Sequence, residues 1–310
     1  QRPVGAEKTS LKQVSVIGSG MMGSGIAYAS ILQGLEVLLI DQNIKAAEAG
    51  KAKIEMLLSE SVKRKKLSEE EKIRLLKKVK THSSLENISS SDLVIEAVFE
   101  DLNLKHKLYK KIEPHLKEGA ILASNTSTLP ITKLSEVLAD STRFLGIHFF
   151  SPVDKMNLVE LIKSERTNDN ALAVALDYTS LIKKTPIVVN DSRGFYANRC
   201  IIPYINEGLR MLSEGIEPAL IENSAKQIGM PVGPLQLLDE LSVSLALNVA
   251  KETKEALGTK YEETGTESIL LEMSQKNRLG RKELAGFYEY DEKGRRLKLW
   301  EGLRNLNREK

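Results

Sequence analysis

The sequence predicts an α/β domain followed by an all-α domain, and two observations carry this prediction. In the first half of the chain, short apolar runs that suit buried strands alternate with segments of helical period. After about Asn190 the helical period takes over, and no β-rich run occurs until Gly286–Tyr290. At 310 residues the chain is also too long for one average core. We therefore expect two domains, residues 12–190 and residues 191–310.

A glycine-rich turn follows the first apolar run. Val14–Gly18 has the composition of a buried strand and leads directly into a turn and a helical pattern. In such a turn the first glycine makes the tight bend, the second lets the backbone approach a pyrophosphate, and the third permits close packing of helix against strand. The free N–H groups of the helix N-terminus then face the phosphates. The first domain is therefore predicted to be a Rossmann-type dinucleotide-binding domain, with these residues at the cofactor: Gly18, Gly20, Met21, Met22 and Gly23.

The second apolar run, Val37–Ile40, ends in Asp41. A carboxylate at this position accepts hydrogen bonds from the ribose hydroxyls of NAD and repels the 2′-phosphate of NADP. Gln42 and Asn43 follow it and bring no arginine that would reverse this preference. The sequence therefore predicts NAD as the cofactor, with Asp41 and Gln42 in its binding site.

Two further apolar runs end in polar residues. The run 92–98 leads into Phe99-Glu100-Asp101, and the run 120–123 leads into Ser124-Asn-Thr-Ser-Thr128. The carboxyl ends of the strands of an open parallel sheet border its ligand crevice. We expect these polar residues to line that crevice.

The segment from Ala46 to Lys80 is helical in pattern and heavily charged. Ser68 and Glu71 form a capping box, which predicts that two helices meet at Leu67-Ser68. Before this box lies the basic cluster Lys63-Arg-Lys-Lys66. Such a cluster is either a solvated helix face or a phosphate-binding edge for a polyanionic substrate, and the sequence leaves both interpretations open.

His148 and Glu160 lie in two apolar, strand-like runs that a short polar turn separates. A carboxylate among aliphatic residues is costly to bury unless a hydrogen-bonding partner meets it, and the turn can bring His148 beside it. An imidazole held by a carboxylate has a fixed tautomer and a raised basicity, as a group that abstracts protons near neutral pH requires. The alternative is a structural histidine beside a solvent-facing glutamate at a strand edge.

Composition excludes several classes of protein. The 45 basic and 42 acidic residues leave a net charge of only +3, which does not favour a nucleic-acid binder. The single cysteine, Cys200, excludes an intrachain disulfide and a multi-cysteine zinc site, and we interpret it as a small buried hydrophobe. No metal-ligand spacing, membrane-spanning run or signal-peptide core occurs. We expect a cytoplasmic protein, and the start at Gln1 rather than Met suggests a processed chain or a part of a longer one.

Seven motifs occur in the order seen in L-3-hydroxyacyl-CoA dehydrogenases, and nearly the whole chain resembles that family. The resemblance is greatest to the dehydrogenase portion of the bacterial multifunctional fatty-acid oxidation α-chain. The motifs are Gly18-Ser-Gly-Met-Met-Gly23, Glu96-Ala-Val-Phe-Glu-Asp101, Ser124-Asn-Thr-Ser127, His148-Phe-Phe-Ser-Pro152, Leu158-Val-Glu-Leu161, Gly194-Phe-Tyr-Ala-Asn-Arg199 and Gly286-Phe-Tyr288.

The resemblance implies roles for individual residues. His148 resembles the catalytic base that takes the proton of the 3-hydroxyl, and Glu160 the residue that orients it. Ser127 and Asn198 resemble the two donors that hold the reacting oxygen. Three residues match positions on the cofactor side of the site, and two basic residues match the segment that meets the coenzyme A phosphates. These are Glu100, Lys105 and Asn125 for the cofactor, and Lys63 and Arg64 for the substrate.

The resemblance further implies that the protein oxidises (S)-3-hydroxyacyl-CoA to 3-oxoacyl-CoA with NAD in fatty-acid β-oxidation. It also implies a homodimer formed through the helical domain, or membership of a larger multifunctional chain. Two alternatives stay open. Another NAD-dependent hydroxyacid dehydrogenase would share the nucleotide-binding half, although several such enzymes use a lysine as acid and base. A non-catalytic NAD-binding structural or assembly module would bind the cofactor without turnover.

Overall fold

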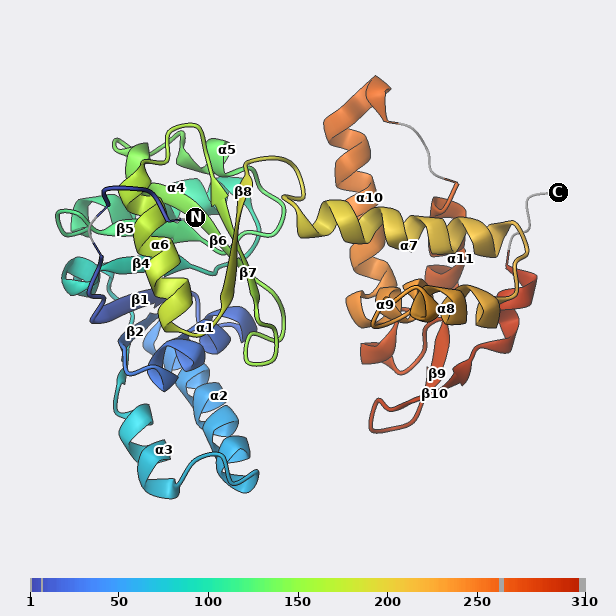
Figure 1. The fold of residues 1–310 in the computed structure, drawn as a ribbon, viewed down its shortest axis with the longest axis horizontal. Helices are drawn as coiled ribbons and strands as arrows, with labels where there is room; N and C mark the ends of the chain where they lie inside the picture. Colours follow the sequence, from blue (N-terminus) through green and yellow to red (C-terminus); the bar gives the residue numbers. More distant parts are fainter. Residues whose placement is uncertain (1, 7, 262–264, 307–310) are drawn as a thin grey trace. The chain divides into compact units, whose positions relative to one another are not determined.

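The computed structural model describes residues 2–6, 8–261 and 265–306, and the chain divides into two compact units, Gln1–Tyr196 and Ala197–Lys310. Figure 1 shows the first unit in blue to yellow-green and the second in yellow to red. The first unit contains an eight-stranded sheet between helices, and the second is mainly helical. An α/β domain followed by a helical domain is thus confirmed.

The strands of the first unit follow the order β3-β2-β1-β4-β5-β6-β7-β8. The first six positions are those of the doubly wound nucleotide-binding sheet, with parallel neighbours throughout. β7 runs antiparallel to β6, and β8 runs parallel to β7. The bounds are β1 (Gln13–Ile17), β2 (Glu36–Ile40), β3 (Val79–His82), β4 (Leu93–Glu96), β5 (Ile121–Ser124), β6 (Phe144–Phe149), β7 (Leu158–Lys163) and β8 (Thr185–Asn190).

Side-chain caps begin most helices of the first unit. The Ser68–Glu71 capping box is present at the start of α3, so the predicted junction of two helices is confirmed. Asp101 caps α4 by accepting from the N–H of Leu104 at 2.7 Å. The helices are α1 (Met21–Leu32), α2 (Ile44–Lys63), α3 (Glu69–Leu76), α4 (Leu102–Ile112), α5 (Ile131–Ser135) and α6 (Asp169–Leu181).

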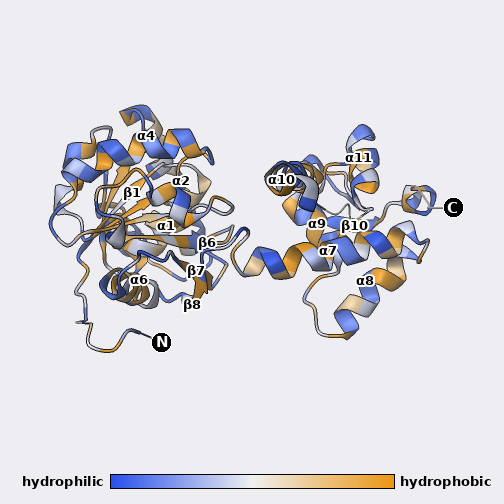
Figure 2. Ribbon diagram, turned by 90° about the horizontal axis from the view of Figure 1, so that it is seen from above, coloured by the Kyte–Doolittle hydropathy of each residue, from blue (hydrophilic) through white to orange (hydrophobic). Residues whose placement is uncertain are grey.

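Two apolar cores lie on the two faces of this sheet. On one face, α1, α2 and α6 pack against side chains such as Val16, Leu39 and Ile147. On the other face, α4 and α5 pack against the alternate strand positions, including Ile17 and Ile40. Figure 2 shows α4 and α6 on opposite sides of the strands, which are mostly coloured as apolar. Burial on both faces explains why the strands read as continuous apolar runs.

One strand of the sheet differs from the prediction. The segment expected to be helical through Lys80 ends at Leu76, and Val79–His82 forms strand β3 instead. β3 is an edge strand that pairs only with β2, and its sequence Val-Lys-Thr-His is polar. An edge strand exposes much of its surface, so it lacks the apolar run that marks the central strands.

In its described residues, the second unit packs five α-helices and a short hairpin around one core. Ile205, Leu209 and Leu212 form an apolar stripe on α7 that contributes to this core. The elements are α7 (Ala197–Ser213), α8 (Pro218–Gln227), α9 (Pro234–Leu241), α10 (Val243–Leu257), α11 (Glu267–Gln275), β9 (Tyr288–Tyr290) and β10 (Arg296–Leu299).

Helices α9 and α10 are separated at Ser242, whose φ of +92° no helix accommodates. Two details of the second unit differ from the sequence-based expectations. The domain expected to be all-α also contains the antiparallel pair β9 and β10. Cys200 is exposed, so its interpretation as a buried residue is wrong. Cys200 lies one position, about 100° around the helix, from the apolar stripe that begins at Ile201.

Two buried carboxylates connect the helices of the second unit to its hairpin. Glu222 accepts from the N–H of Leu235 at the start of α9 and from the hydroxyl of Tyr288. Asp239 accepts from the N–H groups of Phe287 and Tyr288. Among the residues that the structure describes, the donors that reach these carboxylates come from the unit itself, so we assign both residues to its structure.

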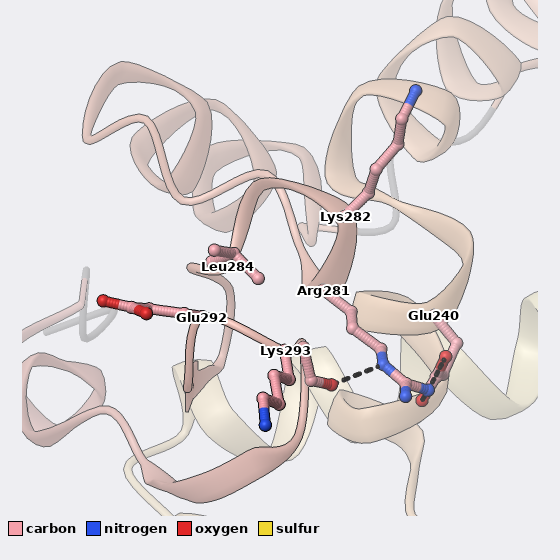
Figure 3. A pocket seen from close by; sticks show the side chains of 7 residues that line it. Glu240, Arg281, Lys282, Leu284, Glu292 and Lys293 are labelled. Carbon is pink, nitrogen blue, oxygen red and sulfur yellow. Dashed lines mark hydrogen bonds and ion pairs between the residues drawn. The ribbon is translucent and has the colours of Figure 1, made fainter.

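An open hollow of about 440 Å³ lies beside the turn between β9 and β10 in the second unit. In Figure 3 the side chain of Arg281 reaches from this hollow to Glu240 and to the turn that carries Lys293. Arg281 contacts both carboxylate oxygens of Glu240 at 2.9 Å and the carbonyl of Gly294 at 2.9 Å. These contacts fix the turn.

Among the described residues, no helix combines the length and the apolar character that crossing a bilayer requires.

Candidate active site

The three glycines of the predicted turn have different structural needs. Gly18 has a φ of +98°, and a Cβ there would lie 2.5 Å from the carbonyl oxygen of Ala97. A Cβ on Gly23 would lie 1.8 Å from the carbonyl oxygen of Gly18. A Cβ on Gly20 would meet no atom within 4 Å. The fold itself therefore requires Gly18 and Gly23, whereas Gly20 leaves open space before the N-terminus of α1.

Asp41 lies at the end of β2, beside this turn. Its Oδ2 accepts from the N–H and the hydroxyl of Ser19 at 2.7 and 2.6 Å, and its Oδ1 accepts from the N–H of Gln42 at 2.8 Å. Burial acts to raise the pKa of Asp41, but these hydrogen bonds outweigh it and lower the pKa. Met21 and Gln42 are exposed, and Met22 is half-buried. The site therefore presents a charged carboxylate next to the open glycine turn.

Glu100 organises the turn that follows β5. Its Oε1 accepts from the hydroxyl of Thr126 at 2.5 Å and from the N–H groups of Ser127 and Thr128 at 2.9 and 3.1 Å. Its Oε2 lies 2.7 Å from Nζ of Lys105. Burial acts to raise the pKa of Glu100, but the ammonium and these donors lower it to about 2. Glu100 therefore stays a charged acceptor.

Lys105 is buried rather than placed at the surface of the crevice. Its side chain on α4 is 1% exposed, and its Nζ also lies 3.2 Å from Glu96. A lysine is almost never fully buried without such partners. The resemblance places Lys105 on the cofactor side of the site. In the structure Lys105 contacts Glu100, and Glu100 lies between Lys105 and the 126–128 turn.

His148 and Glu160 are directly paired residues of the antiparallel strands β6 and β7. Nδ1 of His148 lies 2.6 Å from Oε2 of Glu160, and both residues are buried, so the predicted pairing is confirmed. The other oxygen, Oε1, accepts from the N–H of Tyr196 at 2.9 Å. The rings of Phe150 and Phe195 pack at 4.6 and 5.9 Å from the imidazole. Because the carboxylate accepts, Nδ1 donates, and Nε2 is left as the basic nitrogen.

Asn125 joins the Ser127 turn to the strand that carries His148. Its side-chain oxygen accepts from the N–H of Phe149, the residue after His148, at 2.9 Å. Its own N–H donates to the carbonyl of Glu96 at 2.8 Å. The structure therefore brings together Asn125, the Ser127 turn and the His148 strand within the first unit. Asn198 lies in the first turn of α7, in the second unit.

The expected phosphate-binding residues lie at the end of α2. Lys63 is the last residue of this helix and Arg64 caps it, and both are exposed. Arg64 also lines a cavity of about 350 Å³ between α1, α2 and the loop after β6. The lining includes two further cations, Lys66 and Lys155, beside apolar and hydroxyl groups of Tyr28, Leu57 and Ser61. Lys63 is not among the residues that line it.

Glu96 is a buried residue of this region to which the sequence-based reasoning gave no role. It ends β4 and is 0% exposed. Its side chain contacts Lys105 and Tyr109 on α4 and Ser124 at the end of β5. The signal was available in the sequence, because Glu96 is a carboxylate inside an apolar run, as Glu160 is.

Two family models match the chain. The model described as "3-hydroxyacyl-CoA dehydrogenase, NAD binding domain" matches residues 13–192. The model described as "3-hydroxyacyl-CoA dehydrogenase, C-terminal domain" matches residues 194–290. Together they cover most of both compact units.

Several solved structures are similar to this chain over 91% of its length. (S)-3-hydroxybutyryl-CoA dehydrogenase PaaH1 from Ralstonia eutropha is 37% identical, covered over 100% of its chain, with a TM-score of 0.84. FadB2 from M. tuberculosis is 31% identical, also covered over 100%, with a TM-score of 0.84. A 3-hydroxybutyryl-CoA dehydrogenase from Escherichia coli is 30% identical with a TM-score of 0.85, and this chain spans 60% of its length.

Proposed function

This chain belongs to the 3-hydroxyacyl-CoA dehydrogenase family and is an NAD-dependent dehydrogenase, and from this premise we propose that His148 is its catalytic base. The substrate is a 3-hydroxyacyl-CoA thioester, and we assign it the (S) configuration. We assign the reaction to fatty-acid β-oxidation. The observation that carries the proposal is the 2.6 Å contact between His148 and Glu160. This contact is buried in the sheet whose strand β1 leads into the glycine turn.

His148 takes the proton of the 3-hydroxyl at Nε2 as the C3 hydride leaves. Bound NAD supplies the hydride acceptor. The Glu160 carboxylate holds Nδ1 as the donor, so the lone pair of Nε2 is the one that meets the substrate. The positive charge that develops on the ring is stabilised by the same carboxylate. The surrounding aromatic rings exclude water and strengthen this interaction.

Ser127 and Asn198 donate hydrogen bonds to the reacting oxygen at C3. Charge on this oxygen rises on the way between alcohol and ketone, so donors in place beforehand lower the barrier. Glu100 supports Ser127, because it accepts from the backbone N–H of Ser127 and of the next residue. Asn125 and Glu100 keep this donor turn beside the nicotinamide side of the cofactor site.

The two nucleotide-bearing ligands bind at different edges of the first unit. Gly18, Gly20, Met21, Met22 and Gly23 hold the pyrophosphate of NAD at the N-terminus of α1, and Asp41 with Gln42 faces the adenosine ribose. The coenzyme A phosphates lie at the end of α2, where Lys63 and Arg64 are exposed and Lys66 adds a third cation.

The test is reduction of acetoacetyl-CoA, followed by NADH absorbance in wild type and in His148→Gln. We expect kcat to fall on the order of 100-fold or more, the scale of one general acid or base. NAD affinity, measured by calorimetry, stays unchanged. His115→Gln is the matched control, because His115 is a half-buried histidine in the short 3-10 helix Glu113–His115 that follows α4. Full turnover by His148→Gln, or none by wild type, refutes the proposal.

We also propose that the helical unit mediates a homodimer. Large apolar side chains at the end of α9 and the start of α10 are exposed, including Leu241 at 42% and Leu245 at 49%. Exposed apolar surface of this kind commonly marks an interface. Sedimentation at several concentrations tests this, with Leu245→Lys expected to shift the equilibrium toward monomer. A fully active wild-type monomer at all concentrations contradicts it.

A further inference from the structure

We infer that Asp191 is a positioning residue, which anchors the segment 191–196 to the first turn of α5 and so keeps the ring of Phe195 packed against His148. The inference rests on the proposed function, because it concerns how the proposed base is enclosed. In this role Asp191 acts through Phe195 rather than on a reacting atom.

The backbone of the segment 191–196 has an unusual conformation where it meets the imidazole. Gly194 has a φ of +73° and Phe195 a φ of +50°. This left-handed region suits glycine, whereas an aromatic residue rarely adopts it, because its Cβ crowds the backbone. Such a conformation persists only where the surrounding structure holds it in place. Phe195 therefore needs contacts that fix the chain before it and after it.

Glu160 fixes the chain directly after Phe195. Its Oε1 accepts from the N–H of Tyr196 at 2.9 Å, while its Oε2 meets His148. The N–H of Phe195 itself donates to the carbonyl of Ser192 at 2.9 Å. This contact with Ser192 is internal to the segment, so it closes a turn but does not attach the segment to the rest of the unit.

Asp191 fixes the chain before Phe195. Its Oδ1 accepts from the N–H of Ile131 at 2.8 Å, and its Oδ2 accepts from the N–H and the hydroxyl of Thr132 at 2.7 and 2.5 Å. These donors belong to α5, 60 and 59 residues earlier in the chain. α5 in turn packs on β6, because a Cβ on Gly146 would lie 2.8 Å from Cδ1 of Ile131. Asp191 therefore attaches the segment to a helix that lies against the strand of the proposed base.

Phe195 encloses the imidazole from one side. Its side chain is 2% exposed and belongs to the same apolar core as Ile131. Its ring lies 5.9 Å from the imidazole and is tilted by 56°. Without the Asp191 contacts, the residue is free to relax to a negative φ, and its ring then leaves the imidazole. Water then reaches a base whose interaction with Glu160 is stronger in apolar surroundings.

A carboxylate that only caps a helix predicts a different result. Asp140 provides the comparison, because it also accepts from the N–H and the hydroxyl of one threonine, Thr142. It lies before β6, at the opposite end of that strand from His148. Loss of such a cap lowers stability without uncovering the imidazole. Asp140→Asn is therefore the matched control for Asp191→Asn, which turns an amide NH₂ toward the N–H of Thr132.

The first experiment measures how fast diethyl pyrocarbonate modifies each histidine of the free protein, followed by mass spectrometry of its peptides. His82 and His115 are internal references, since both are half-buried and lie in other parts of the first unit. We expect Asp191→Asn to raise the rate at His148 by about 10-fold, because local opening controls access to a buried group. The references, and all histidines of Asp140→Asn, keep the rates of wild type. An unchanged rate at His148, or an equal rise at all histidines, overturns the inference.

Turnover of acetoacetyl-CoA is the second readout. We expect Asp191→Asn to lower kcat by about 10-fold, with calorimetric NAD affinity within about 3-fold of wild type. An unchanged kcat overturns the positioning role. If Asp191→Asn does not fold, Thr132→Val takes its place with the same directions of change, since it removes the hydroxyl donor and keeps the carboxylate.

A double-mutant cycle with Phe195→Leu tests whether Asp191 acts through the aromatic ring. If it does, Asp191→Asn raises the modification rate of His148 by less than about 3-fold once the ring is gone. Rate increases that multiply overturn the inference.

The two hypotheses fail separately. Full turnover by His148→Gln, or a wild type without turnover, refutes the proposed function, while the modification rates still judge the role of Asp191. Unchanged modification rates refute the role of Asp191 and leave that of His148 intact.

Discussion

Glu160 faces His148 across a directly paired position of β6 and β7, with its Oε2 2.6 Å from Nδ1 of the imidazole. Its second oxygen holds the N–H of Tyr196, the last residue of the first unit. One buried carboxylate therefore orients the proposed base and also fixes the end of the unit that carries it.

Replacing Glu160 by Gln tests this double role. A glutamine offers one acceptor oxygen, whereas the ring N–H and the Tyr196 N–H both need one. We expect kcat for acetoacetyl-CoA to fall on the order of 100-fold and the free energy of unfolding to fall by about 1–3 kcal/mol. NADH absorbance and thermal melting measure these effects. Glu165→Gln, an exposed change after the same strand, serves as control. Normal activity in Glu160→Gln contradicts the assigned role.

Alanine substitutions in the glycine turn should separate folding from cofactor binding. A Cβ on Gly23 meets the carbonyl of Gly18 at 1.8 Å, whereas a Cβ on Gly20 meets nothing within 4 Å. Gly23→Ala is therefore expected to lower the melting temperature of the free protein. Gly20→Ala should leave it unchanged and weaken NAD binding by about 10-fold or more, because the pyrophosphate needs that space. Equal NAD affinity of Gly20→Ala and wild type would place the pyrophosphate elsewhere.

Asp41 should determine the preference for NAD over NADP. Asp41→Asn keeps the shape of the side chain but removes the charge that repels a 2′-phosphate. We expect the ratio of kcat/KM for NAD to kcat/KM for NADP to fall by about 10-fold or more, the scale of hydrogen bonds to a charged group. Steady-state kinetics with both cofactors measure this ratio. Asp169→Asn, at the exposed start of α6, should leave it unchanged.

The cations at the end of α2 should act on the nucleotide part of coenzyme A only. Arg64→Ala is expected to raise KM for acetoacetyl-CoA by about 10-fold, with a smaller effect at high salt because salt screens exposed charges. KM for acetoacetyl-pantetheine, which lacks the nucleotide phosphates, should not change. Arg74→Ala removes an exposed cation from α3 and is the control. Equal effects on both thioesters argue against a phosphate contact.

Asp239 should make the stability of the second unit depend on pH. Burial raises the pKa of Asp239 to about 6, although hydrogen bonds from Phe287, Tyr288 and Tyr290 oppose the rise. Because the pKa of Asp239 is higher in the folded unit than in the unfolded chain, the protonated carboxyl stabilises the fold. This stabilisation is complete below the unfolded pKa of about 4. It is lost as the pH rises through 6, by up to about 3 kcal/mol for a rise of about two pKa units.

Fluorescence of the single tryptophan, Trp300, follows unfolding of this unit. Asp239→Asn should flatten the pH dependence of the free energy of unfolding of the second unit between about pH 4 and pH 7. Glu292→Gln, an exposed change in the hairpin, should keep the dependence of the wild type. Identical pH profiles for wild type and Asp239→Asn would show that this carboxyl does not cause the effect.

Features built from neighbouring residues could be predicted from the sequence. The glycine turn needs its glycines within one β-turn-α segment, so its spacing alone identifies it. His148 and Glu160 are only 12 residues apart, and a short turn pairs their strands. The capping box at Ser68 is likewise local. By themselves, these patterns determined the nucleotide-binding architecture, the change to a helical second unit and the pairing of the proposed base with its carboxylate.

Features built across the sheet were decided by tertiary structure. Glu96 meets Ser124 because β4 and β5 pair in register, and Asn125 meets Phe149 through the crossover to β6. The polar edge strand β3 became a strand only because β2 supplies its partner. The burial of Lys105 and the exposure of Cys200 also depend on which side of a helix meets the core. A single side chain shows its own chemistry, but its partners come from chain segments that only folding brings within hydrogen-bonding distance.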